Sequence, residues 1–224
     1  MSTPDIPLLD ISRWREGSQR QREDLAARMD RALQDSGFLM IENHGVPAAL
    51  RDRIRAQART FFALPHDRKA RYATPVAGRG WIPQGGEAGP AREGQFRVAP
   101  HTDWGILTIL DRQPGYGGLQ IQTPAGTWAD APYVEDAFTV NVADLLSRWT
   151  GERWRSTRHR VLPPPRNAPD EELISLIVFL EAEVDTVIRP VAGNNDLEPV
   201  VAGEWLRARE AAATVAQPAA ETAG

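Results

Sequence analysis

The second half of the chain is divided by turn residues into short segments that read as strands. From Arg97 onward, β-branched and apolar stretches alternate with Gly, Pro, Asp and Asn. These stretches predict strands over 106–111, 118–123, 126–131, 137–142, 156–162, 172–182 and 185–191. Many short strands with frequent turns are typical of two packed sheets, an arrangement that limits exposed edges. The expected fold class is therefore mainly β with flanking helices, around a double-stranded β-helix (jelly-roll) core.

The first third of the chain carries helix signals between two strand signals. Residues 18–21 resemble a capping box, and an apolar stripe at spacing four follows at Leu25, Met29 and Leu33. This pattern predicts a helix that ends near Gly37, followed by a strand over 38–42. Pro47 then suits the first turn of a second helix. We expect the buried stripe of that helix to contain Leu50, Ile54, Ala58 and Phe61, with its arginines facing solvent.

Length and composition suit one folded domain with three regions. The chain has 224 residues, 42% of them hydrophobic, with seven Trp and six Phe to fill a core. We divide it into a helix and strand region at 1–96, the jelly-roll core at 97–202, and a C-terminal helix with a frayed tail at 203–224. No apolar run approaches the length of a membrane span.

Several classes of function are excluded by what the chain lacks. With no Cys, it has no disulfide, thiolate nucleophile or Cys-ligated metal centre. Lys69 is the only lysine, which leaves Schiff-base chemistry one poor candidate. A formal net charge of −4 argues against nucleic acid as a partner. The first residues lack the pattern of a signal peptide, so we expect a cytoplasmic protein without membrane attachment.

His101, Asp103 and His159 form the pattern that points most directly to chemistry. Two imidazoles and one carboxylate are the ligand set of non-haem Fe(II) oxygenases. If 101–103 is extended, His101 and Asp103 share a face, and His159 arrives on a neighbouring strand. From the residues alone, a metal site and an ordinary His–Asp surface contact both stay open. We expect the other two histidines to be structural, His44 in a turn hydrogen bond and His66 on the surface.

Several segments in register resemble the isopenicillin N synthase-like family of 2-oxoglutarate and Fe(II)-dependent oxygenases. They lie along most of the chain and follow the order of that family: 6–12, 37–47, 101–108, 117–122, 140–150 and 156–161. The resemblance implies that His101, Asp103 and His159 bind Fe(II). It also implies an oxygenase that uses O2 and 2-oxoglutarate to hydroxylate, desaturate or cyclise a small-molecule substrate. An Fe(II) oxidase that needs no keto acid, and a non-catalytic metal-binding remnant or binding module, stay open as alternatives.

One departure from the family concerns the grip on 2-oxoglutarate. The family usually has Arg-x-Ser on the strand after the second histidine, and Leu173-Ile174-Ser175 stands there in this chain. We predict that Ser175 contacts the cosubstrate. Leu173 cannot replace an arginine, because it has no positively charged guanidinium to donate two hydrogen bonds to a carboxylate. We predict that Arg97 binds the distal carboxylate of 2-oxoglutarate in place of the missing arginine. In a regular strand, Arg97 would point to the same face as His101 and Asp103.

A second departure is the short middle of the chain. Between Tyr72 and His101 the family normally has a long helical stretch and further strands, whereas here a Gly- and Pro-rich link joins 80–86 to 97–100. Loss of those elements should uncover one face of the sheet. Because large exposed apolar patches mark interfaces or aggregation sites, we expect a homodimer or a poorly soluble monomer.

Overall fold

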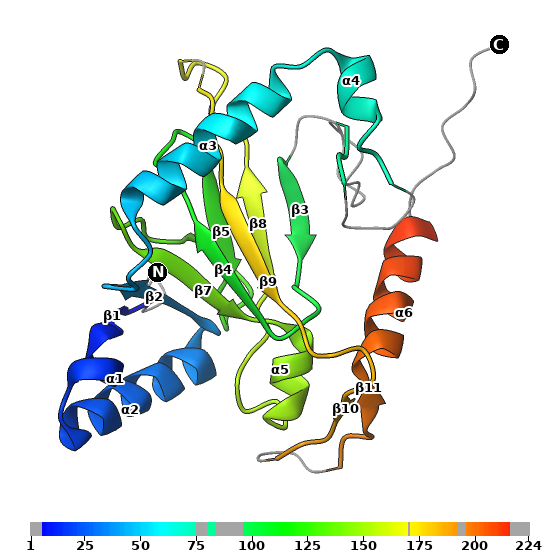
Figure 1. Ribbon diagram of the computed structural model, residues 1–224. Coiled ribbons are helices and arrows are strands. Elements are labelled where there is room, and N and C mark those ends of the chain that lie inside the picture. The colour runs from blue at the N-terminus through cyan, green and yellow to red at the C-terminus, as the bar shows by residue number, and fades with distance from the viewer. Residues whose placement is uncertain (1–5, 75–79, 84–95, 170, 192–195, 216–224) are drawn as a thin grey trace.

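Two β-sheets form the centre of the molecule, as Figure 1 shows for the computed structural model. It describes residues 6–74, 80–83, 96–169, 171–191 and 196–215. The five-stranded sheet has the order β1 (Leu8–Asp10), β2 (Phe38–Glu42), β7 (Phe138–Val142), β4 (Leu107–Asp111) and β9 (Leu176–Leu180). The four-stranded sheet has the order β3 (Val98–His101), β8 (His159–Leu162), β5 (Gly118–Gln122) and β6 (Trp128–Asp130). A small ribbon pairs β10 (Val187–Ile188) with β11 (Val200–Val201).

One apolar core fills the space between the two sheets. Its fully or nearly buried members include Phe38 and Met40 from β2 and Leu119 and Ile121 from β5. Leu110 of β4 packs against them. Because side chains alternate along a strand, Thr108 points to the same inner face as Leu110. This two-layer arrangement with flanking helices agrees with the predicted fold class.

A second core lies on the outer face of the five-stranded sheet. Helix α2 (Gln19–Asp35) buries Leu25 and Leu33 there, beside α5 (Asp144–Trp149) and next to the short α1 (Ser12–Glu16). The predicted capping box at the start of α2 is confirmed. Its two bonds run from Gln21 N to Ser18 Oγ at 3.4 Å and from Ser18 N to Gln21 Oε1 at 2.8 Å.

Most predicted strands are confirmed with shorter bounds. The strand at 38–42 is matched residue for residue, whereas the segment at 156–162 becomes extended only from His159 and that at 185–191 pairs only over 187–188. The C-terminal helix α6 runs over Ala202–Val215. No helix among the described residues is long and apolar enough to span a membrane.

Helix α3 (Ala48–Phe62) corrects our assignment of its buried side. Leu50 and Ile54 are 39% and 46% exposed, whereas Arg51 and Arg55 are 7% and 5% exposed. The reason is Asp111, which points outward from β4 and lies 2.7 Å from Arg55 and 3.4 Å from Arg51. A buried carboxylate needs a cation close by, so the basic side of the helix packs on the sheet. The short helix α4 (His66–Ala70) follows.

The last strand of the five-stranded sheet is an apolar edge. Among the described strands, β9 pairs with β4 alone. Four consecutive side chains of β9 are between 50% and 59% exposed: Ile177, Val178, Phe179 and Leu180. Most of the short link predicted before β3 falls at 84–95, outside the described residues.

We predict that the Asp111 ion pairs stabilise the packing of α3. Asp111→Ala leaves two buried guanidinium groups without their shared carboxylate, which should lower the free energy of unfolding by about 3–5 kcal/mol. Asp52→Ala is the matched control, because Asp52 is 75% exposed at 3.9 Å from Arg55 and should cost less than about 1 kcal/mol. Urea denaturation of both variants measures the difference. Equal, small losses would contradict this account.

Candidate metal centre

His101 and His159 are brought together by the pairing of β3 with β8. The two residues stand directly opposite each other in the antiparallel register, and their ring centroids lie 4.3 Å apart. The neighbouring strand thus delivers the second histidine, as predicted. His159 is buried against the edge of Phe38, whose ring centroid lies 5.7 Å away. The side chain of His101 is 39% exposed, so the pair opens to solvent on that side.

Asp103 reaches the histidines from the turn that follows β3, so His101 and Asp103 face each other as expected although the strand ends earlier than the prediction assumed. Strand β3 ends at His101, yet Asp103 Oδ1 lies 3.5 Å from His101 Nε2 and 3.6 Å from His159 Nε2. The start of α5 holds this turn, because Asp144 N donates to Asp103 O at 2.8 Å and Leu145 N donates to Gly105 O at 2.9 Å. Backbone hydrogen bonds to a helix start, rather than strand parity, therefore aim the carboxylate.

The second oxygen of Asp103 is occupied by neighbouring side chains. Asn141 Nδ2 donates to Asp103 Oδ2 at 2.8 Å, and Thr108 Oγ1 donates to the same oxygen. Both donors lie on the inner face of the five-stranded sheet, where Thr108 of β4 pairs with Asn141 of β7. These bonds leave Oδ1 as the oxygen that faces the imidazoles.

Both histidines are oriented by backbone carbonyls. His101 Nδ1 lies 2.8 Å from Ala99 O, and His159 Nδ1 lies 3.2 Å from Thr157 O. Since a carbonyl only accepts, each Nδ1 carries the proton, and each Nε2 presents its lone pair toward Asp103. Such bonds are the usual outer support of a metal-binding histidine. The donor atoms all lie within 4.8 Å of one another, and they fit a divalent ion that prefers two imidazoles and one carboxylate.

Electrostatics keep these groups in their ligand forms. Burial opposes ionisation of Asp103, but the hydrogen bond with His101, the positive charge that His159 carries when protonated, and the bonds from Asn141 and Thr108 outweigh it and hold the pKa of Asp103 below its usual range. Burial and the neighbouring His101 lower the pKa of His159, although Asp103 opposes that shift. A carboxylate and a neutral imidazole are the forms that bind metal.

Thr108, Asn141 and Glu181 are site residues that the sequence did not single out. Asn141 had a signal, since it is a polar residue within the otherwise apolar run of 140–142, but Thr108 looked like an ordinary strand residue. Glu181 follows β9 and approaches the turn at Gly105. Burial, helped by Asp103 and Glu210, raises the pKa of Glu181.

The predicted cosubstrate residues both lie just before strands. Ser175 immediately precedes β9, and Leu173 packs against Gly115. Arg97 is exposed and precedes β3, where an irregularity shifts the register between Val98 and His101. That bulge removes the regular alternation on which the assignment of Arg97 depended, so its contact with the cosubstrate stays a prediction without structural support.

The two remaining histidines have the structural roles expected of them. His44 accepts from Val46 N at Nδ1, donates to Asp136 O from Nε2 at 3.0 Å, and stacks on Phe138 with 3.7 Å between ring centroids. His66 is exposed and contacts the edge of Trp81. The turn and surface assignments are confirmed.

We predict a pH-dependent loss of stability in the metal-free protein. The buried His159 resists protonation, whereas the unfolded residue takes a proton near the ordinary value of 6.5. The unfolded state then binds more protons, so the free energy of unfolding falls as pH decreases through that value. His159→Gln should flatten this fall between about pH 7 and pH 5, and His66→Gln should not. Urea denaturation after chelation of metals measures the slopes; identical slopes in wild type and His159→Gln would refute the assignment.

Two family models match the chain. The first, described as the N-terminal region of a non-haem dioxygenase in morphine synthesis, matches residues 6–106. The second, the 2OG-Fe(II) oxygenase superfamily, matches residues 70–182, which is half of the chain. The second match includes all three candidate ligands.

Similar proteins of known sequence point to the same family. Validamycin A dioxygenase of Streptomyces hygroscopicus subsp. limoneus is 29% identical over 311 positions, covering 91% of this chain and 85% of the relative. That alignment is longer than this chain of 224 residues, so part of it consists of gaps in this chain. The 2-oxoglutarate-dependent dioxygenase tropC of Talaromyces stipitatus is 38% identical over 116 residues, which cover 51% of this chain and 34% of the relative.

Solved structures confirm the fold. A full-length Neurospora crassa protein in complex with alpha-KG superposes with a TM-score of 0.81 at 23% identity, over 94% of this chain and 97% of that one. A 2OG-Fe(II) oxygenase family protein from Caulobacter crescentus gives a TM-score of 0.75 at 19% identity, over 92% of this chain and 98% of that one. The jelly-roll core is thereby confirmed. Together with the half-chain family match, these findings show that the chain belongs to the 2OG-Fe(II) oxygenase superfamily, oxidoreductases that use Fe(II), 2-oxoglutarate and O2 on small-molecule substrates.

Proposed function

We propose that His101, Asp103 and His159 bind one Fe(II) per chain, and that the protein uses it with 2-oxoglutarate and O2 to oxidise a small molecule. Hydroxylation, desaturation and ring closure are the reactions that this chemistry supports. One observation carries the proposal. Asp103 Oδ1 and the Nε2 atoms of both histidines face a common point, with distances of 3.5 and 3.6 Å from the carboxylate oxygen to the two nitrogens.

Each residue of the centre has a separate task in this proposal. The imidazoles contribute neutral donors, and Asp103 contributes one negative charge through a single oxygen because Asn141 and Thr108 hold the other. When bound, Fe(II) with open positions supplies the redox chemistry for oxidative decarboxylation of the keto acid and activation of O2. Phe38 shields His159 from water on the buried side. The exposed side at His101 is the approach for substrate.

The replacement at Leu173 favours a second candidate, an Fe(II) oxidase of the same fold that needs no keto acid. The two candidates differ in stoichiometry. Protein loaded with Fe(II) under anaerobic conditions is exposed to O2 with and without 2-oxoglutarate, and succinate and oxygen consumption are measured. Succinate formed in step with O2 supports the first candidate. Oxygen consumption that is indifferent to 2-oxoglutarate supports the second, and no consumption in either condition would contradict both.

We predict sharp loss of Fe(II) binding on removal of one ligand. Anaerobic titration should give one Fe(II) per chain in wild type. Asn141→Leu, which removes one of the two hydrogen bonds that hold the second oxygen of Asp103, should weaken binding about 10- to 100-fold, and His159→Ala should weaken it more. His44→Ala is the matched control because that histidine lies in a turn outside the centre.

The fold should survive the loss of a metal ligand, because none of the three is a member of either apolar core, although His159 contacts Phe38. Far-ultraviolet circular dichroism checks this point for each variant. Unchanged iron affinity in a folded His159→Ala protein would disprove the assignment of the ligands.

We also propose that the protein forms a homodimer through the apolar edge at β9. The exposed side chains of 177–180 and the single pairing partner of β9 among the described strands support this surface. The acidic net charge of −4 supports the proposal that nucleic acid is not a partner, and a cytoplasmic location stays a prediction from the sequence.

We predict that a charge on β9 shifts the protein toward monomer. Val178→Asp places a carboxylate on a strand residue that is 59% exposed, so it should oppose burial of that edge against a second copy. Val191→Asp is the control, since Val191 is 71% exposed and lies outside every strand. Light scattering over a range of concentrations measures the mass. A wild-type protein that stays a monodisperse monomer at high concentration would contradict the proposal.

A further inference from the structure

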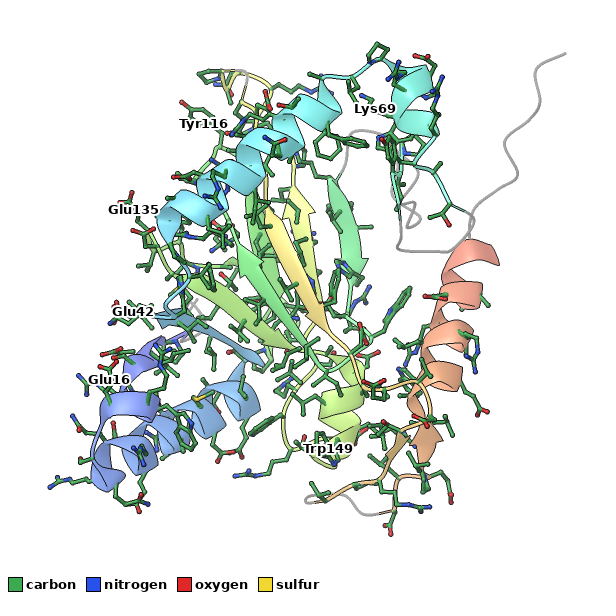
Figure 2. All side chains as sticks on the ribbon, in the orientation of Figure 1. Glu16, Glu42, Lys69, Tyr116, Glu135 and Trp149 are labelled. Carbon is green, nitrogen blue, oxygen red and sulfur yellow. The ribbon has the colours of Figure 1, made fainter. Side chains whose placement is uncertain are left out.

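Arg112 follows β4 and points toward the space between the two sheets. Asp111 faces outward to α3, and Leu110 belongs to the core between the sheets, so Arg112 continues the inner face. Its guanidinium crosses to the other sheet, where Nη2 donates to Pro132 O and the group lies 5.8 Å from the ring centroid of Tyr133. The arginine is thus held at the rim of the jelly-roll interior. Tyr116, labelled in Figure 2, lies in the turn that follows this end of β4.

No carboxylate balances this arginine among the residues that the structure describes. Arg51 and Arg55, on the opposite face of the same sheet, share Asp111, whereas Arg112 forms no ion pair within the described ranges. Burial lowers the pKa of Arg112, opposed only by the nearby Tyr133. A guanidinium has five N–H donors, and a desolvated one gains from an anion that accepts from two of them.

Ser175 stands beside Arg112 across the sheet. The pairing of β4 with β9 ends at Asp111 and Leu176, and Arg112 and Ser175 are the next residues of the two segments beyond that pair. A bond of 3.0 Å from Ile174 N to Gln113 Oε1 keeps the two segments adjacent beyond the strand ends. Ser175 also alternates with Ile177, which pairs with the inward-facing Leu110. The exposed Ser175 and the guanidinium-bearing Arg112 therefore lie next to the same end of the β4–β9 pair.

The metal centre lies along the same face of β4. Thr108, which donates to Asp103, precedes Arg112 by four residues, or about 13 Å of extended chain. Two groups together can span this distance of about 13 Å. One is the long side chain of Arg112, extended toward Thr108, and the other is a five-carbon dicarboxylate bound at the metal. Other arginines are poorly placed. Arg160 stacks on Trp128 with 4.2 Å to the ring centroid and bonds to Gln120, on the face opposite to His159, and Arg97 is exposed.

We propose that Arg112 binds the distal carboxylate of 2-oxoglutarate, with the Ser175 hydroxyl beside it, and so replaces the arginine that is absent at Leu173. The proposal rests on the proposed function, because it needs the keto acid to bind at the metal. In this proposal the arginine that binds the distal carboxylate follows β4, whereas the family has it just before the strand that corresponds to β9. The two strands are neighbours in the sheet.

Binding of two keto acids to protein loaded anaerobically with Fe(II) tests this assignment by calorimetry. 2-Oxoglutarate has the distal carboxylate, and 2-oxopentanoate has the same chain length without it. Arg112→Gln should weaken 2-oxoglutarate about ten- to hundredfold, the loss of one charge-assisted pair, and leave 2-oxopentanoate unchanged. Arg160→Gln is the matched control and should change neither ligand, because Arg160 is held by Gln120 and Trp128.

Two further variants separate a lost contact from a damaged fold. Arg112→Lys keeps the charge without the planar fork, so it should bind 2-oxoglutarate more tightly than Arg112→Gln and less tightly than wild type. Leu173→Arg, added to Arg112→Gln, should restore selectivity for 2-oxoglutarate by supplying the cation from β9. Unchanged Fe(II) affinity in every variant reports that the metal centre is intact.

The outcomes distinguish this inference from the function on which it rests. A wild type that binds 2-oxoglutarate no better than 2-oxopentanoate overturns the carboxylate grip at Arg112, and a wild type that binds neither keto acid overturns the proposed function as well. Tight, selective binding that survives Arg112→Gln overturns the inference alone. Equal loss of both ligands in Arg112→Gln and Arg112→Lys also overturns it, since a grip on the distal carboxylate discriminates between them.

Discussion

The hydrogen bonds around Asp103 are the contacts on which the centre depends. Its backbone carbonyl is tied to the start of α5, and one carboxylate oxygen is tied to Asn141 and Thr108, so the other oxygen has a single direction left. Those partners come from β4, β7 and the first residue of α5, all of which belong to or border the five-stranded sheet. The histidines belong to the four-stranded sheet. The metal site therefore exists only when both sheets are packed, which couples its geometry to the core between them.

Opposite charges on the two faces of β4 organise the rest of the sheet. Asp111 on the outer face draws the arginines of α3 onto the sheet, and the helix leaves Leu50 and Ile54 exposed as a consequence. The side chain of Arg112, the next residue, contacts Pro132 and Tyr133, which follow β6 of the facing sheet. A buried carboxylate and a buried guanidinium thus occupy adjacent positions without neutralising each other. The outward charge has its partners within the fold, and the inward one is left for a ligand.

Sequence patterns predicted the elements better than the orientation of individual side chains. Period and turn residues located β2 and the capping box of α2, because those signals are local. The three candidate ligands could also be identified from the sequence, since they depend on residue type and order, and the structure brings them together. The buried side of α3 was wrong, because apolar spacing suggested Leu50 and Ile54 and nothing local revealed Asp111 across the interface. Asp103 and Arg97 could not be oriented by parity for a similar reason: the strand ends before Asp103 and bulges between Val98 and His101.

Exposed apolar side chains of α3 and β9 accompany the short middle of the chain. Helix α3 presents Leu50, Ile54 and Phe62 to solvent, and β9 presents four apolar side chains at the edge of the same sheet. The alignment with the Streptomyces relative is longer than this chain, so that relative has additional residues. The metal ligands need none of those elements, since each is held by strands and turns that remain. When a two-sheet fold lacks a peripheral segment, we expect its metal centre to stay intact and apolar surface to become exposed. The candidate centre and the exposed side chains of α3 and β9 fit that expectation.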